Sequence, residues 1–182
     1  MDFPSRISAG LREWQAEWSS RGEFAERQVA AVRTSSLAAA VLRECSQAYR
    51  RNLNSHAVGV TMVSILKLLD HLRFSTGLEP ESAGVDDIFD LIPAVRIAAR
   101  AALDRGDEAA SAHATLGELS LVSGDQASPS DRELALNHYV QAATSAVDRD
   151  ALLERLRLFA ALGFRPALVS AAMQAVDSEP RQ

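Results

Sequence analysis

Apolar residues recur at spacings of three and four along most of the chain, and strict alternation of apolar and polar residues is scarce. This spacing is that of amphipathic helices, whereas a half-buried strand alternates at every second residue. Gly, Pro, Ser, Asn and Asp gather between the periodic segments, as they do in turns. The pattern predicts an all-α protein with helices over residues 5–19, 23–32, 34–51, 56–74, 86–104, 108–123, 131–147, 150–162 and 166–176.

Three of the predicted helices carry distinctive local signals. The segment 56–74 is apolar on most sides, which predicts a helix in the centre of the fold. The polar cluster at residues 34–36 offers hydroxyl groups that can cap the helix that follows. Pro93 lies inside the segment 86–104, where its ring and its missing N–H predict a kink or a break.

A repeated arrangement of small and large residues links the later helices. One helix carries Leu116 and Gly117, and the next carries Ala135, Tyr139 and Ala142. Glycine and alanine let two helix backbones approach closely, while the tyrosine fills the space between neighbouring pairs. The same register continues at Val41, Cys45 and Ala48, at Val95, Ala99 and Ala102, and at Val169, Met173 and Val176.

This register amounts to roughly three and a half degenerate copies of the tetratricopeptide repeat (TPR), a helical hairpin of about 34 residues. We therefore expect antiparallel helical hairpins stacked as a short, right-handed, TPR-like superhelix. Residues 1–20 are expected to form an N-terminal helix that caps the array, residues 21–177 the repeat domain, and residues 178–182 a frayed end.

Two stretches of the clearest repeat resemble a known family. Residues 114–125 read ATLGELSLVSGD and residues 135–143 read ALNHYVQAA. They resemble the TRAFs-binding TPR region of apoptosis signal-regulating kinases and of many bacterial proteins, and a looser resemblance extends over residues 41–176. The resemblance implies a sensor or scaffold module in a bacterial stress or defence system, with a partner that supplies the effector. The family's Asn is replaced by Thr61, so its ligand role does not carry over.

Charge and composition narrow the classes of partner. The formal net charge is −5 and the pI is about 5.4, which disfavours a nucleic-acid binder because such proteins carry a basic surplus or stripe. No apolar run is long enough to span a bilayer, and the first residues lack a signal-peptide pattern. We therefore expect a cytoplasmic protein that does not contact membranes or nucleic acid.

The candidate catalytic residues point to no reaction. Asp86, Asp87 and Asp90 form a run that on a helix can hold Mg²⁺, but a second metal motif is missing. We interpret this run as an acidic helix start that complements the helix dipole. Metal-binding histidine pairs, nucleophile motifs and phosphate loops are absent from the sequence. We predict a protein that is not an enzyme and has no metal or cofactor, with a Mg²⁺-dependent enzyme as the least favoured alternative.

Two further side chains are expected to be structural. Cys45 is the only cysteine, so an internal disulfide is excluded, and its apolar helical surroundings predict a buried, inert thiol. His113 lies in a packing position of the repeat, where we expect a hydrogen-bonded core histidine rather than a ligand.

A TPR array binds through the concave face that the first helix of each hairpin lines, so we expect the ligand there. The mixed polarity of that face suits a protein or peptide segment. The alternative is a nucleotide-like ligand bound by Lys67, Arg155 and Arg157. The candidate groove residues are Thr61, Ser64, Lys67, Glu118, Leu121, Glu154, Arg155 and Arg157.

Trp14 and Trp18 share one stripe of the first predicted helix, outside the repeats. We expect them to cap the open apolar end of the array, since terminal repeats must cover their exposed face. The alternative is that they anchor a partner, because tryptophan is favoured at binding hot spots. An uncovered apolar end of the array would also allow a homodimer.

Overall fold

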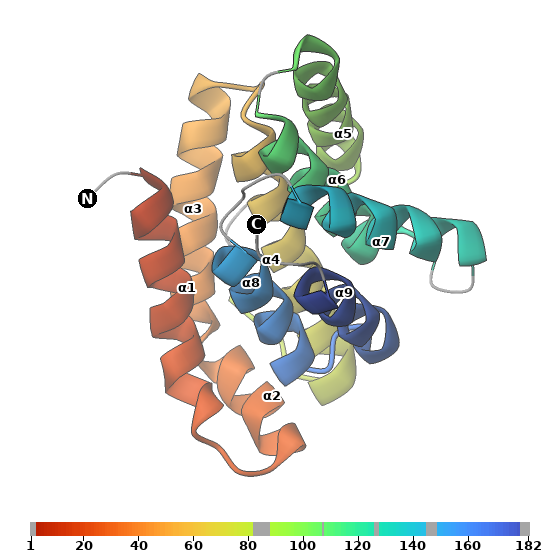
Figure 1. The fold of residues 1–182 in the computed structure, drawn as a ribbon. Coiled ribbons are helices and arrows are strands. Elements are labelled where there is room, and N and C mark those ends of the chain that lie inside the picture. The colour runs from red at the N-terminus through yellow and green to blue at the C-terminus, as the bar shows by residue number, and fades with distance from the viewer. Residues whose placement is uncertain (1–2, 82–87, 107, 126–127, 145–148, 179–182) are drawn as a thin grey trace.

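The computed structural model describes residues 3–81, 88–106, 108–125, 128–144 and 149–178. Within these ranges the chain forms nine helices and no strand (Figure 1), which confirms the predicted all-α class. None of the helices in these ranges combines the length and apolar character needed to cross a membrane. The helices are α1 (Phe3–Ser19), α2 (Phe24–Arg33), α3 (Ser35–Arg51), α4 (His56–Thr76), α5 (Ile88–Arg105), α6 (Ala109–Ser123), α7 (Pro129–Thr144), α8 (Arg149–Ala161) and α9 (Pro166–Ser178).

The observed helices begin and end close to the predicted bounds, with two local differences. α5 continues through Pro93, so the helix is not broken there. Little of the described helix precedes this proline, and both α4 and α6 pack against α5, so tertiary contacts outweigh one lost backbone hydrogen bond. Thr34 precedes α3 without capping it, because its Oγ1 donates to the carbonyl oxygen of Ala30 at 2.9 Å.

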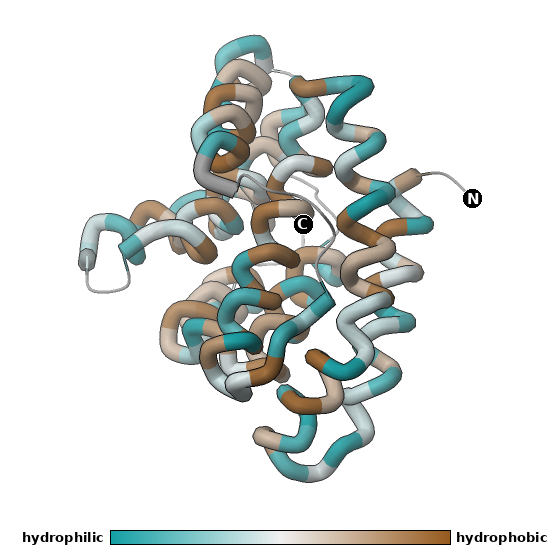
Figure 2. Tube along the Cα trace, turned by 180° about the vertical axis from the view of Figure 1, so that it is seen from behind, coloured by the Kyte–Doolittle hydropathy of each residue, from teal (hydrophilic) through white to brown (hydrophobic). Residues whose placement is uncertain are grey.

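α4 lies at the centre of the fold, as its apolar pattern predicts. The helices α2, α3, α5 and α6 all pack against it, and Figure 1 shows it behind α8. Seen from behind in Figure 2, hydrophilic residues recur along the outer helices. Burial of a large aliphatic side chain stabilises a fold by about 1.5–3 kcal/mol, and α4 buries Val60, Met62, Val63, Ile65, Leu68, Leu69 and Leu72.

Most helices adjacent in the chain pack together, and so do several pairs of helices two apart. The adjacent pairs include α4 with α5, α6 with α7 and α8 with α9, and the others include α2 with α4, α4 with α6 and α7 with α9. Gly117 permits the close approach of α6 and α7. A Cβ atom at Gly117 would lie 3.2 Å from Cδ2 of Tyr139 and 3.4 Å from the carbonyl oxygen of Ala135. This contact is the one that the small-residue spacing predicts.

Hydrogen bonds to α2, α4 and the end of α6 hold the turn between α8 and α9 in place. Nε2 of Gln28 on α2 and Nε2 of His71 on α4 lie 2.9 Å and 3.2 Å from the carbonyl oxygen of Leu162. From the turn itself, Nη1 of Arg165 donates to the carbonyl oxygens of Leu121 and Gly124 at the end of α6, each at 2.7 Å. These bonds fix the α8–α9 hairpin beside α2, α4 and α6, and so position the candidate site on α8.

Candidate functional site

A pocket of about 240 Å³ opens between α1, α4 and α8. Its wall on α1 runs from Phe3 to Gln15, which corresponds to about 18 Å along the helix axis. Cys45 of α3 also contributes to the lining. Most of the lining is apolar, and its larger apolar side chains are Phe3, Ile7, Leu11, Val58 and Leu158.

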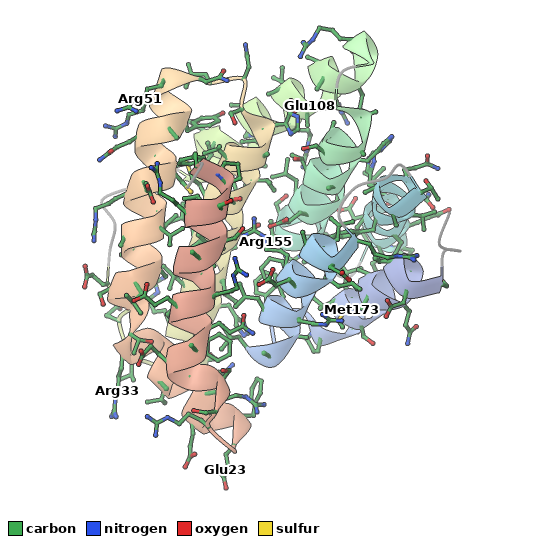
Figure 3. The ribbon with its side chains drawn as sticks, turned by 60° about the vertical axis from the view of Figure 1, so that its left-hand side comes forward. Glu23, Arg33, Arg51, Glu108, Arg155 and Met173 are labelled. Atoms are coloured by element: carbon green, nitrogen blue, oxygen red, sulfur yellow. The ribbon has the colours of Figure 1, made fainter. Side chains whose placement is uncertain are left out.

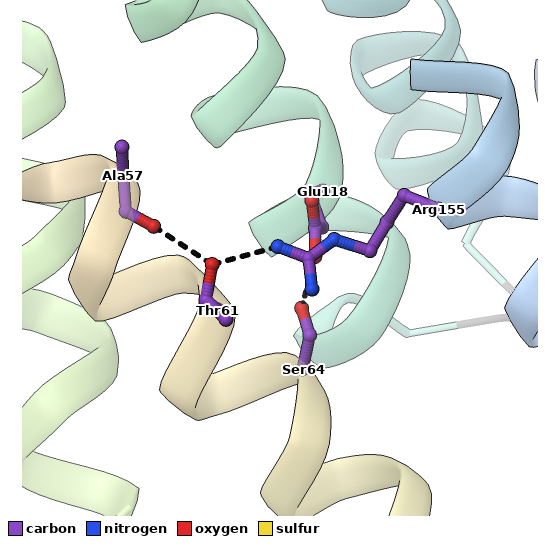
Figure 4. Close-up of polar contacts among 5 residues, drawn as sticks. All are labelled: Ala57, Thr61, Ser64, Glu118 and Arg155. Atoms are coloured by element: carbon purple, nitrogen blue, oxygen red, sulfur yellow. Dashed lines mark hydrogen bonds and ion pairs between the residues drawn. The ribbon is translucent and has the colours of Figure 1, made fainter. Parts of the chain in front are cut away.

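A hydrogen-bonded polar cluster adjoins this pocket and joins α4, α6 and α8 (Figure 4). Nη2 of Arg155 donates to Oγ1 of Thr61 at 2.6 Å, and Nε of Arg155 lies 3.4 Å from Oε1 of Glu118. The hydroxyl of Thr61 in turn donates to the carbonyl oxygen of Ala57 at 3.0 Å. The hydroxyl of Ser64 donates to the same carboxylate oxygen of Glu118. Arg155 and Thr61 also line the pocket, so the cluster forms part of its wall.

The ion pair in this cluster is largely removed from solvent. The side chain of Arg155 is 20% exposed and that of Glu118 is 10% exposed. Charges at such depth are screened weakly, but their removal from water costs free energy that only good pairing recovers. Pairing is incomplete, because Nη1 of Arg155 and the hydroxyl of Tyr139 are buried with no hydrogen-bond partner among the described residues. Burial raises the pKa of Tyr139 well above its ordinary value, and the charge of Glu118 raises it further.

A second ion pair spans the mouth of the pocket. Nε of Arg12 on α1 lies 3.7 Å from Oε1 of Glu154 on α8, and these side chains are 61% and 47% exposed. Exposed ion pairs contribute about 0–1 kcal/mol to stability, so this contact opens at little cost. Figure 3 shows Arg155 on the side of α8 that faces α1.

Among the described residues, the Cys45 thiol is the only sulfur that lines the pocket. Its residue is fully buried, and burial raises the pKa of the thiol to about 12, outweighing the opposite effect of the Arg155 charge. The thiol is therefore protonated at neutral pH, as the apolar surroundings in the sequence predict, and it is a poor nucleophile.

The structure brings five of the predicted groove residues to one place. Thr61, Ser64, Glu118 and Arg155 form the polar cluster, and Glu154 lies at the pocket mouth. The side chains of the cluster bond mainly to each other. Thr61, Ser64 and Glu118 are buried, so they do not face an open groove.

The remaining three predicted groove residues lie elsewhere. Lys67 lines a separate hollow beside His71 and Arg165, and Arg157 is exposed and lines neither this hollow nor the pocket. Leu121 is fully buried in the core, so its prediction as a groove residue is wrong. α6 is apolar around most of its circumference, so the sequence does not distinguish its buried side, which carries Leu121, from a side that faces a groove.

Trp14 and Trp18 are fully buried. Their rings meet edge to face with centroids 6.0 Å apart, and Nε1 of Trp14 donates to the carbonyl oxygen of Ala31 at 3.1 Å. Trp14 therefore ties α1 to α2, and neither ring presents a surface to a partner, which corrects the alternative of partner anchors. Their apolar bodies gain more from burial in this core than from exposure to solvent.

Sequence reasoning missed the wall that α1 contributes, including Phe3, Ser8 and Arg12. Ile7 and Leu11 share the apolar stripe of the first helix with Trp14 and Trp18, which is visible in the sequence. That stripe could have suggested a groove, but periodicity does not say which neighbouring helix an apolar face meets.

Only one residue of the enzyme alternative lies within the described structure. Asp86 and Asp87 lie outside the described residues, and Asp90 is exposed on α5. Within the described ranges, no group of three or more His, Cys, Asp or Glu side chains is arranged to hold a metal ion. His113 is half-buried and hydrogen-bonded to His138, as expected for a structural histidine.

Comparisons of the chain with protein-family models, with curated proteins and with solved structures each find no match.

Proposed function

We propose that the chain is a non-enzymatic protein-binding module, and that the pocket between α1, α4 and α8 receives an apolar side chain from a partner segment. The observation that carries the proposal is the pocket itself, which is mostly apolar and is lined by helices far apart in the chain. Interface hot spots combine a buried apolar anchor with a polar surround. Here Arg12, Glu154 and Arg155 provide such a surround.

We further propose that the helices form a short TPR-like array. The contacts of α4 with α5, α6 with α7 and α8 with α9 support this arrangement, since a TPR pairs adjacent helices as hairpins. The contacts between α2, α4 and α6 also support it, because the first helices of successive repeats stack. Together with the resemblance to TRAFs-binding TPR regions, they favour a sensor or scaffold that acts through a partner.

Two observations favour a protein segment over a nucleotide-like ligand. The pocket of about 240 Å³ is smaller than the ~300–1,000 Å³ sites that drug-sized ligands fill, but it suits one or two large side chains. The three cations of the nucleotide alternative are also dispersed. Lys67 lines a different hollow from Arg155, and Arg157 lines neither, so they cannot surround one phosphate group in this structure.

The test is to fill the pocket without disturbing the core. Ala151 is exposed on α8 and lines the pocket, whereas Ala160 is exposed on the same helix and does not. A displayed library of random short peptides is selected on the wild-type chain, and the enriched peptides are measured on Ala151→Trp and Ala160→Trp. We expect Ala151→Trp to weaken binding at least about tenfold and Ala160→Trp to leave it unchanged. Absence of enriched peptides, or equal binding to both variants, would contradict the proposal.

A further inference from the structure

We infer that the partner segment bound in this pocket carries a carboxylate beside its apolar anchor, and that Arg155 binds that carboxylate. The inference rests on the proposed function, because it assigns a chemistry to the ligand of the same pocket. Its basis is the charge of the pocket lining and the incomplete hydrogen bonding of Arg155.

Among the described residues, the charged side chains that line the pocket are two cations and one anion. Arg12 and Arg155 contribute the positive charges and Glu154 the negative charge, while Glu118 is not among the lining residues. Cations therefore outnumber anions in this lining, although Arg155 also pairs with Glu118 and the formal net charge of the chain is −5. The apolar walls strengthen the preference for an anionic group, since charges interact more strongly where water is displaced.

Arg155 has hydrogen-bonding capacity left for a ligand. Its Nη2 is taken by Thr61, but its Nη1 is buried without an acceptor among the described residues, which is unfavourable. The distance from its Nε to Glu118 is 3.4 Å, longer than the ~2.7–2.9 Å of a strong charge-assisted bond. A ligand bound through Nη1 would leave the Nη2 bond to Thr61 and the Nε contact with Glu118 in place. A carboxylate there would accept two parallel N–H bonds, the pairing to which the planar guanidinium is suited.

Arg12 is the weaker candidate for this role. Its side chain is 61% exposed, and its Nε faces both the carbonyl oxygen of Ser8 at 3.3 Å and Glu154 at 3.7 Å. Solvent screens a cation at that exposure, so Arg12 attracts a carboxylate less strongly than Arg155 does. Arg155 is 20% exposed and fixed by α4, so it can discriminate a carboxylate from a neutral amide.

The test selects the random peptide library in parallel on the wild-type chain, Arg155→Met and Arg12→Met. Wild type and Arg12→Met are expected to enrich peptides with Asp or Glu beside a large apolar residue. Arg155→Met is expected to enrich the apolar residue alone. For the tightest wild-type peptide, replacing the acid by its amide should weaken binding about tenfold on wild type and less than about twofold on Arg155→Met.

Arg155→Met leaves Glu118 buried without its ion partner, which can unfold the domain. The double variant Arg155→Met/Glu118→Gln is therefore selected as well, since the amide can still accept the bond from Ser64. Pocket-dependent peptides with no acidic preference on wild type would overturn this inference and leave the proposed function standing. An acidic preference that survives in both Arg155 variants would overturn it too, by assigning the carboxylate to another group. Peptides that bind regardless of Ala151→Trp would instead overturn the proposed function.

Discussion

Nε2 of Gln28 donates a hydrogen bond of 2.9 Å to the carbonyl oxygen of Leu162, which lies 134 residues further along the chain. The bond ties α2 to the turn between α8 and α9. Gln28 is 6% exposed, so water cannot easily replace either partner. Since α8 carries Arg155 and one wall of the pocket, this distant contact helps to position the candidate site.

Replacing Gln28 with alanine is expected to lower the free energy of unfolding by about 1–2 kcal/mol, because a buried hydrogen bond is lost. The loss is limited because His71 still reaches the same carbonyl oxygen at 3.2 Å. Gln47→Ala is the matched control, since Gln47 is exposed on α3. Urea unfolding monitored by circular dichroism measures both variants. Equal stability of Gln28→Ala and Gln47→Ala would show that the bond does not hold the hairpin in solution.

Much of the fold follows from the sequence because its signals are local. The apolar residues of α4 lie on most of its sides, and a helix of that kind is stable only when other helices surround it. The contact of Gly117 with Tyr139 was also predictable, because small residues are what closely packed helices require. The repeat register also placed Thr61, Ser64, Glu118 and Arg155 on neighbouring helices, but as residues of an open groove rather than as a hydrogen-bonded cluster with three buried members.

The features of the fold and the site that the sequence does not predict depend on long-range contacts, which leave no local pattern. Arg165 has a φ of 46°, and its Nη1 bonds the carbonyl oxygens of Leu121 and Gly124, which are 44 and 41 residues away. Nothing near Arg165 in the sequence indicates those acceptors. The pocket wall on α1 was missed likewise, because an apolar stripe indicates burial but not the helix against which it packs.

Gly59 on α4 is expected to tolerate no side chain. A Cβ atom there would lie 2.3 Å from Cγ2 of Val95 and 3.0 Å from Cε2 of Tyr49, so α4 cannot keep its distance from α3 and α5. Gly59→Ala gains about 1 kcal/mol in helix propensity, but overpacking costs about 1–3 kcal/mol. We expect a net loss of stability in thermal unfolding.

Two variants check the Gly59 prediction. Gly22→Ala should change stability by less than about 0.5 kcal/mol, because a Cβ atom at Gly22 meets nothing within 4 Å. In Gly59→Ala/Val95→Ala the smaller side chain makes room, so the double variant should cost less than the sum of the two single variants. Additive costs would mean that the two positions are not in contact.

The Cys45 thiol is expected to resist modification in the folded protein. It is fully buried, and burial raises its pKa to about 12, so its thiolate fraction is about a thousandfold below that of an unperturbed cysteine. Reaction with a disulfide reagent at mildly alkaline pH should be slow until urea unfolds the chain. Rapid labelling of the native protein would instead mean that α1 moves away from α8 and exposes the thiol through the pocket.

His113 on α6 and His138 on α7 form a pair whose protonation opposes the folded state. Their Nδ1 atoms lie 2.9 Å apart, so one donates to the other and both cannot carry a proton there. Burial lowers the pKa of both rings, and the charges of His113 and Arg100 lower that of His138 further.

Because these pKa values are lower in the folded state, the unfolded chain binds more protons once the pH falls below about 6.5. The contribution of the pair to stability is therefore fully present above that pH and is lost as the pH falls towards the folded pKa values. Urea unfolding at about pH 7.5 and pH 5.5 should show this loss, and His138→Gln should make it smaller because one of the two coupled rings is gone. Part of the loss of stability at low pH should remain in His138→Gln, since burial lowers the pKa of His56 as well. An unchanged pH dependence in His138→Gln would assign the acid sensitivity to His56 or to other groups.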